Sequence, residues 1–322
     1  MTTRKSKVLN CIQRPFVLGI TRAYRKISTA AASVLAGLIL LPIKAMQEAA
    51  IDSVFLLKMC KTFGGITYDV SEYEFKSSQL DTHPSLYMKG VFTYHDPALA
   101  PNTDDLRVII FTDGSKLDGK VGCAFVAYNK GDVPATCKGH MNPGNTVFQA
   151  EVLALHKAIG WLTKTSQRYA TIFTDSLSAM HAFKNPRHSA HLVTEAQKTL
   201  RANTSTSKIR ISWVKAHSGT QGNEKAGELA KEAAQNQGAE KVSILLPKSH
   251  LKGKAWEACG RRNEVQSNKG GRTQDFIHRM TTDWVISAPC LTRFIMGHGP
   301  FPSYFKDRVI STTNSCVCGN EG

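Results

Sequence analysis

Two apolar stretches in the middle of the chain each end in a Phe-Thr-Asp sequence, with Asp113 closing the first and Asp175 the second. If the two stretches are neighbouring strands of one sheet, both carboxylates lie at the same edge, where α/β proteins place their ligand sites. Glu151 stands between them in the first turn of a helical stretch, from which it can lean toward that edge. This pattern favours folds in which the three carboxylates converge.

Each of these residues also has an ordinary explanation. Asp113 precedes Gly-Ser, which is typical of a turn, and Asp175 precedes Ser, which is typical of a helix cap. Caps and turns do not explain why two strands should end in the same three residues with an acidic helix start between them. We therefore favour a joint role for the three carboxylates.

The segment from 104 to 240 alternates between strand-like and helix-like patterns. Short apolar runs predict strands, and apolar positions at helical spacing predict helices. The predicted strands cover 108–111, 121–128, 135–138, 171–173 and 209–214, and the predicted helices cover 147–161, 177–183, 191–202 and 223–235. The order βββαβααβα defines an α/β fold with a mixed five-stranded sheet, whose first three strands form an antiparallel meander.

The charge balance points to a polyanionic partner. The 322 residues include 41 Lys and Arg against 25 Asp and Glu, a formal net charge of +16. Such a surplus suits nucleic acid or an anionic membrane face, although a soluble basic protein would also show it. The carboxylate cluster inside a basic chain favours nucleic acid. Three converging carboxylates repel one another unless a divalent cation holds them, and oxygen ligands alone favour Mg²⁺ or Mn²⁺ over zinc.

Four motifs resemble, in order, those of type 1 ribonuclease H. They are Phe111-Thr112-Asp113-Gly114-Ser115, Phe148-Gln149-Ala150-Glu151, Thr174-Asp175-Ser176 and Trp213-Val214-Lys215-Ala216-His217-Ser218-Gly219. The run Gly222-Asn223-Glu224-Lys225-Ala226 resembles the version carried by non-LTR retrotransposon polyproteins of arthropod type. We expect the chain to be a C-terminal piece of such a polyprotein, without its polymerase active site.

The resemblance implies hydrolysis of the RNA strand in an RNA–DNA hybrid. Two metal ions would sit about 4 Å apart across the scissile phosphate, with Asp113 bridging them and Glu151 and Asp175 sharing the remaining positions. His217 matches a loop histidine that shuttles protons or assists product release. A surface histidine in a Ser-Gly loop is the alternative for His217.

One position departs from the family pattern. After Asn223-Glu224 the family has alanine followed by aspartate, which is the fourth metal ligand, and here the second of these positions is Gly227. Glu224 and Glu228 lie nearby on the same helix, but neither is placed where the missing carboxylate would be. The alternative to an active hybrid ribonuclease is therefore an impaired module that binds nucleic acid.

The flanks divide the chain into further segments. We expect residues 1–62 to be a helical remnant resembling the region after a reverse transcriptase core and 63–103 to be a linker. The ribonuclease H domain would span 104–240 and a basic tail 241–322. In that tail, Cys316 and Cys318 resemble the start of a Cys/His element that the chain does not complete.

The N-terminal segment also raises the question of a membrane or a targeting signal. It is basic, has no acidic residue before Glu48, and contains an apolar run from 30 to 43. That run is shorter than the roughly 20 residues of a transmembrane helix and contains Pro42, and an acid-poor start also imitates a transit peptide. We expect no stable membrane association. The eight cysteines show no disulfide framework, which favours reduced thiols and an intracellular location, in the nucleus or cytoplasm.

Overall fold

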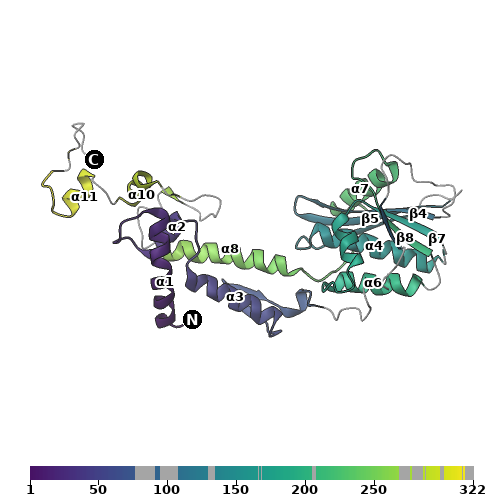
Figure 1. Cartoon of the computed structure of the whole chain (residues 1–322), viewed down its shortest axis with the longest axis horizontal. Helices are drawn as coiled ribbons and strands as arrows, with labels where there is room; N and C mark the ends of the chain where they lie inside the picture. The colour runs from purple at the N-terminus through teal and green to yellow at the C-terminus, as the bar shows by residue number, and fades with distance from the viewer. Residues whose placement is uncertain are drawn as a thin grey trace. The chain divides into compact units, whose positions relative to one another are not determined.

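The computed structural model describes most of the chain in two compact units. One unit comprises Met1–Val70 with Leu251–Gly322, and the other comprises Ser71–His250 (Figure 1). The described residues are 1–76, 91–94, 108–129, 135–165, 167, 169–204, 208–267, 276–277, 286, 288–297, 301–313 and 315.

A seven-stranded mixed sheet with the order β3-β8-β7-β4-β5-β6-β9 forms the centre of the second unit. Its strands are β3 (Phe92–Tyr94), β4 (Val108–Leu117), β5 (Lys120–Asn129), β6 (Ala135–Met141), β7 (Tyr169–Thr174), β8 (Lys208–Trp213) and β9 (Glu240–Lys241). The strands β4, β5 and β6 pair antiparallel with one another, as predicted for the meander. On the other side of β4, the strands β7, β8 and β3 run parallel to it. The predicted mixed α/β fold is confirmed.

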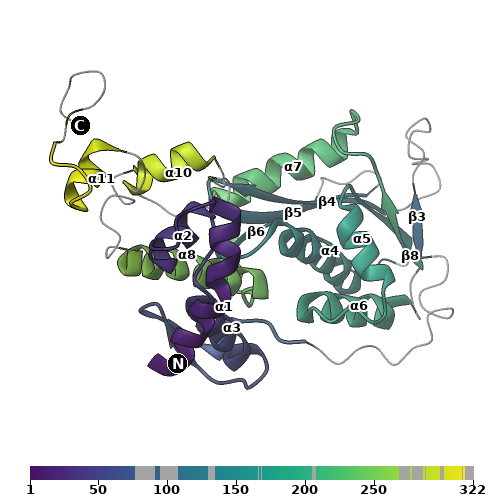
Figure 2. The ribbon, with the colours of Figure 1, turned by 60° about the vertical axis from the view of Figure 1, so that its left-hand side comes forward.

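Helices cover both faces of this sheet. Figure 2 shows α4 (Val147–Lys164), α5 (Leu177–Lys184) and α6 (His191–Thr204) on one face and α7 (Gln221–Ala234) on the other. Side chains alternate along β4, so that Ile110 packs into the cluster with α4, while Ile109 and Phe111 pack against α7. Both faces are buried, which explains why the strand sequences are almost continuously apolar.

The sheet differs from the prediction at three places. Within the described residues it has seven strands instead of five. The prediction missed β3 and β9, because they are short edge strands without an apolar repeat. The strand β3 comes from the stretch expected to be a linker. The strand β4 continues past Asp113 to Leu117, because residues 113–117 keep pairing with β5. The chain instead turns at Asp118 and Gly119, both with positive φ, so that Asp113 lies within a strand and not at its end.

Helices dominate the first unit. They are α1 (Thr3–Thr21), α2 (Thr29–Leu35), α3 (Leu41–Phe55), α8 (Lys248–Ser267), α10 (Pro289–Met296) and α11 (Pro302–Asp307), with a hairpin of β1 (Lys61–Phe63) and β2 (Ile66–Tyr68) and a short 3-10 turn, Val70–Glu72, at its boundary. Although α8 begins in the second unit, most of it belongs to the first. Val17, Ala32 and Leu35 form a buried core with Ile295 and Met296. This core joins the beginning of the chain to the segment near its end.

The apolar run from 30 to 43 is not a single helix. It is divided between α2, which ends at Leu35, and α3, which has Pro42 in its first turn. Among the helices that the structure describes, none combines the length and the apolar character needed to cross a bilayer. Most of the predicted linker and the pair Cys316 and Cys318 lie outside the described residues, and the segment boundaries at 62, 103 and 240 stay predictions.

Two glycines allow a matched test of the packing. An added methyl group at Gly122 in β5 would overlap the backbone of α7 at Ala230, Ala233 and Ala234, whereas one at Gly160 in α4 would meet open space. We expect Gly122→Ala to lower the free energy of unfolding by about 1–3 kcal/mol. The control Gly160→Ala should raise it by up to about 1 kcal/mol, because alanine is the better helix former. Urea denaturation measures both, and equal effects would contradict the close approach of α7 to β5.

Candidate active site

Parallel pairing of β4 and β7 brings two of the predicted carboxylates together. Thr112 pairs with Thr174, so Asp113 and Asp175 are neighbours one residue beyond the last pair. Two residues earlier, on the same face of the sheet, the rings of Phe111 and Phe173 stack with centroids 5.1 Å apart. The shared Phe-Thr-Asp sequence therefore has a structural meaning, because the phenylalanines pack under α7 and the aspartates emerge beside it.

Glu151 reaches the same place from α4. This helix starts with a capping box, in which Thr146 accepts from the backbone N–H of Gln149 and the side chain of Gln149 accepts from the N–H of Thr146. Glu151 lies just after this first turn and is 6 % exposed. An added Cβ at Gly114 would lie 2.5 Å from the backbone nitrogen of Glu151, so only glycine lets the start of α4 sit this close to β4.

Oxygen atoms of Asp113, Glu151 and Asp175 lie within 4.8 Å of one another. Asp113 does not form a turn, since it lies within β4. Asp175 is not a helix cap, since the cap of α5 is Ser176, whose hydroxyl accepts from the N–H of Ala179. Around Asp175, the indole Nε1 of Trp213 donates to its backbone carbonyl at 3.0 Å, and the amide Nδ2 of Asn223 donates to its carboxylate Oδ2 at 3.0 Å.

Burial and mutual repulsion shape the electrostatics of the cluster. Burial, followed by the charge of Asp175, raises the pKa of Asp113 to about 6. Burial, followed by the charges of Asp113 and Asp175, raises the pKa of Glu151 to about 10. The ammonium of Lys231 on α7 opposes the rise at Asp113. Without an added positive charge, Glu151 therefore keeps its proton at neutral pH.

The donor set fits a hard divalent cation. All three side chains offer oxygen, the ligand that Mg²⁺ and Mn²⁺ prefer. Oε2 of Glu151 is buried and has no hydrogen-bond partner within the described part of the chain, which is costly unless something binds it. A cation between these groups would replace the protons and remove the repulsion.

The structure separates His217 from this cluster. His217 lies exposed in the loop between β8 and α7 with a φ of 52°. The described residues that cluster closely enough to hold a metal together are the three carboxylates, without the histidine. A role for His217 in proton transfer or product release stays a prediction.

Gly227 lies directly over the site. A Cβ at this position would lie 3.0 Å from Oδ2 of Asp113, so the position of the missing carboxylate does face the cluster. Glu228 forms an ion pair with Lys225 at 2.9 Å, and Glu224 is exposed. Neither glutamate belongs to the cluster, as the sequence predicted.

Sequence reasoning missed Asn223, Trp213 and Lys231 as neighbours of the carboxylates. Asn223 precedes Gly227 by four residues and Lys231 follows it by four, so Asn223, Gly227 and Lys231 share one face of α7. That spacing was a usable signal. The bond from Trp213 to a backbone carbonyl left no signal in the sequence.

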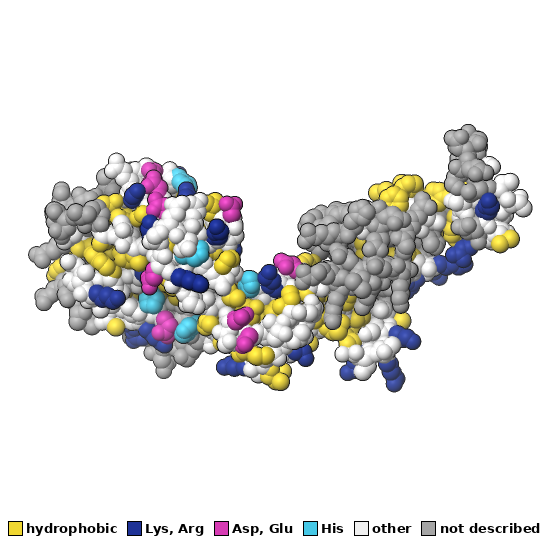
Figure 3. Space-filling model, turned by 180° about the vertical axis from the view of Figure 1, so that it is seen from behind, with side chains coloured by type: hydrophobic (Ala, Val, Ile, Leu, Met, Phe, Trp, Pro, Cys, Tyr) yellow, Lys and Arg dark blue, Asp and Glu magenta, His cyan; other side chains and the backbone are white. Residues whose placement is uncertain are grey.

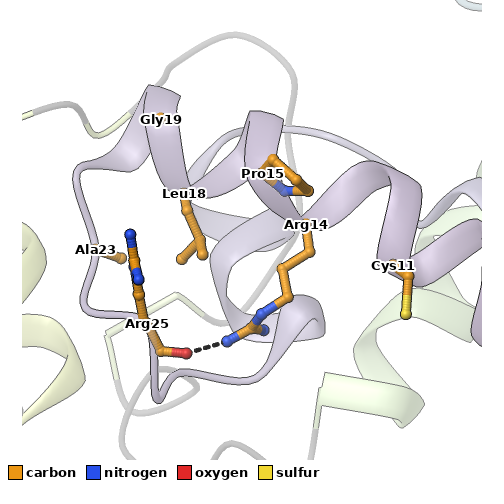
Figure 4. Close-up of a pocket in the computed structure, with 7 residues that line it drawn as sticks. All are labelled: Cys11, Arg14, Pro15, Leu18, Gly19, Ala23 and Arg25. Atoms are coloured by element: carbon orange, nitrogen blue, oxygen red, sulfur yellow. Dashed lines mark hydrogen bonds between the residues drawn. The ribbon is translucent and has the colours of Figure 1, made fainter.

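A separate pocket occurs in the first unit (Figure 4). It is lined by Cys11, Arg14, Pro15, Leu18, Gly19, Ala23 and Arg25. The guanidinium of Arg14 donates to the backbone carbonyl of Arg25 and to the hydroxyl of Thr29, so it is hydrogen-bonded within the unit. This lining has two basic groups and no carboxylate, and it has no part in the cluster described above.

The second unit is a mixed α/β domain with three converging carboxylates, and comparison with known proteins finds a family model that matches part of the chain. Residues 105–235 match the model of the RNase H family. The solved N-terminal RNase H domain of Rv2228c from Mycobacterium tuberculosis is 20% identical, with a TM-score of 0.33, and the match covers 39% of this chain and 98% of that one. RNase H1 from Halobacterium salinarum is 18% identical, with a TM-score of 0.34, covering 40% and 98%. No curated protein sequence matches the chain.

The raised pKa of Asp113 predicts a pH-dependent stability. In the unfolded chain this carboxyl has its ordinary pKa near 3.8, so above that pH the folded form binds a proton that the unfolded form has released. Without divalent cations, we expect the free energy of unfolding to fall as the pH rises through about 6.

The variant Asp113→Asn removes this charge. Its free energy of unfolding should be higher than that of the wild type by about 1–3 kcal/mol at pH 8, with a smaller difference at pH 5. Urea denaturation in EDTA at the two pH values measures this. A difference that does not change with pH would contradict the assignment.

Proposed function

We propose that residues 105–235 hydrolyse the RNA strand of RNA–DNA hybrids with the help of Mg²⁺ or Mn²⁺. The observation that carries this proposal is the cluster of Asp113, Glu151 and Asp175 on β4, α4 and β7, with oxygen atoms within 4.8 Å. The match of the surrounding residues to the RNase H family supports it.

Asp113, Glu151 and Asp175 would hold the cation, which supplies an activated water and neutralises charge on the phosphate. The protein's own part is positional. The β4–β7 pairing fixes Asp113 against Asp175, and Asn223 and Trp213 fix Asp175 from the side of α7 and β8. Burial of Glu151 keeps its carboxyl out of bulk water, so a cation bound beside it would interact with it with little screening by solvent.

Selectivity for hybrids would come from shape and 2′-hydroxyl contacts, not from base sequence. On the face of the second unit seen at the left of Figure 3, Lys and Arg side chains lie among acidic and histidine side chains. Contacts from Lys and Arg to phosphates would bind the hybrid without sequence preference.

The purified chain should cleave the RNA strand of a labelled hybrid in Mg²⁺ or Mn²⁺ and leave double-stranded DNA intact. Asp113→Asn should abolish cleavage, because it removes the carboxylate that faces both other acids and keeps the shape of the side chain. Gel analysis of both strands measures the outcome. Equal cleavage by both proteins would indicate a contaminating nuclease and refute the proposal.

A second candidate function is hybrid binding without turnover. It is favoured by Gly227, which offers no ligand at a position facing Asp113, and by the basic character of the segment from 252 to 272. This candidate predicts salt-sensitive binding to hybrids without cleavage.

The variant Gly227→Asp separates the two candidates. If the second holds, an aspartate here should introduce hybrid cleavage, provided that the Asp113 side chain yields by a few tenths of an ångström. If the wild type is already active, the same change should improve its activity at low Mg²⁺ concentration. Activity that stays absent in both proteins would place the defect elsewhere.

We also propose that the chain derives from a non-LTR retrotransposon polyprotein of arthropod type and acts inside the cell, in the nucleus or cytoplasm. The support is the run from Gly222 to Ala226 together with the flanking motifs of the sequence. Within this proposal, residues 1–62 are the helical remnant, 63–103 the linker, 104–240 the nuclease and 241–322 the basic tail.

A further inference from the structure

Asn223 is the one side chain of α7 that the structure bonds to the carboxylate cluster within the described residues. It lies in the first turn of the helix and is 6 % exposed. Its Nδ2 donates to Oδ2 of Asp175 at 3.0 Å. Its other amide atom, Oδ1, is buried and has no hydrogen-bond partner in the described part of the chain.

An unpaired buried amide oxygen requires an explanation. Leaving such an acceptor unsatisfied lowers the stability of the folded chain. Oδ1 belongs to the same planar amide group whose Nδ2 contacts the carboxylate of Asp175. Amide oxygens are ordinary ligands of hard divalent cations. A cation held by Asp175 would give Oδ1 the partner that the protein does not supply.

The helix geometry connects this residue to the missing carboxylate. Asn223 and Gly227 are four residues apart and therefore lie on one face of α7, one turn from each other. An added Cβ at Gly222 would overlap the ring of Phe111, so the absence of a side chain there lets the start of α7 sit on β4. As a result Asn223 reaches Asp175, while Gly227 lies over Asp113.

We infer that Asn223 is the ligand that α7 contributes to the cation site, binding through Oδ1 in place of a carboxylate at position 227. This inference rests on the proposed function, since it assumes that the carboxylate cluster binds a divalent cation. A neutral amide adds an oxygen but no charge, so the site binds its cation more weakly than one with four carboxylates would. In the alternative role, Asn223 acts only as a hydrogen-bond donor that orients Asp175.

Titration with Mn²⁺ alone distinguishes the two roles, because an aspartate at 223 keeps an oxygen ligand but cannot donate a hydrogen bond. If Asn223 is a ligand, Asn223→Ala weakens Mn²⁺ binding by about tenfold or more, while Asn223→Asp binds Mn²⁺ more tightly than the wild type. If Asn223 is only a donor, both variants bind more weakly and Asn223→Asp shows no gain. Isothermal titration calorimetry on the full chain measures the affinities.

The variant Asn203→Ala serves as the matched control. It also removes a buried amide, one that donates to the carbonyl of Thr199 at 2.8 Å within α6, away from the cluster. Its Mn²⁺ affinity should equal that of the wild type. Thermal unfolding in EDTA verifies that each variant is folded, and Asn223→Asp keeps the question decidable if Asn223→Ala does not fold.

Two results would overturn the inference: wild-type Mn²⁺ affinity in Asn223→Ala, or no gain in Asn223→Asp. Absence of Mn²⁺ binding in the wild type would overturn it as well. Its failure differs from failure of the proposed function, because a protein that binds Mn²⁺ through Asn223 but leaves RNA–DNA hybrids intact would refute only the nuclease activity.

Discussion

The parallel pairing of β4 with β7 is the interaction on which the rest of the site depends. It places Asp113 beside Asp175 on the face of the sheet that α7 covers. The stacked rings of Phe111 and Phe173 fix this register from within the core. A slip of β7 by one residue would turn Asp175 to the face that α4 covers and away from Asp113. The hydrophobic packing of the domain therefore enforces an arrangement that its electrostatics oppose.

The opposition between packing and charge gives the cluster its chemical character. Burial and repulsion raise the pKa values of Asp113 and Glu151, and Glu151 therefore holds a proton at neutral pH in the place where a divalent cation would fit. Small residues make this crowding possible. Gly114 admits the start of α4, and Gly222 admits the start of α7. These two glycines let the starts of both helices approach β4 closely beside the carboxylates.

Much of the fold was predictable because its signals are local. The helices α4 to α7 and the five central strands follow apolar periodicities that a single segment reveals, and apart from the end of β4 their predicted bounds lie within a few residues of those observed. The edge strands β3 and β9 were missed, because a pairing of two or three residues leaves no periodicity. The expectation that the first strand ends at Asp113 was wrong for a related reason, since continued pairing with β5 overrides the turn preference of Asp-Gly-Ser.

The sequence by itself determined the three carboxylates, the order of the elements around them and the departure at Gly227. Each of these follows from residue identity and spacing along one stretch of chain. Only the tertiary structure decided that Asn223 contacts Asp175, that Gly227 faces Asp113 and that His217 lies outside the cluster. These relations depend on how closely α7 approaches the sheet. That distance is set by side-chain volumes on two elements far apart in the sequence, which no local pattern records.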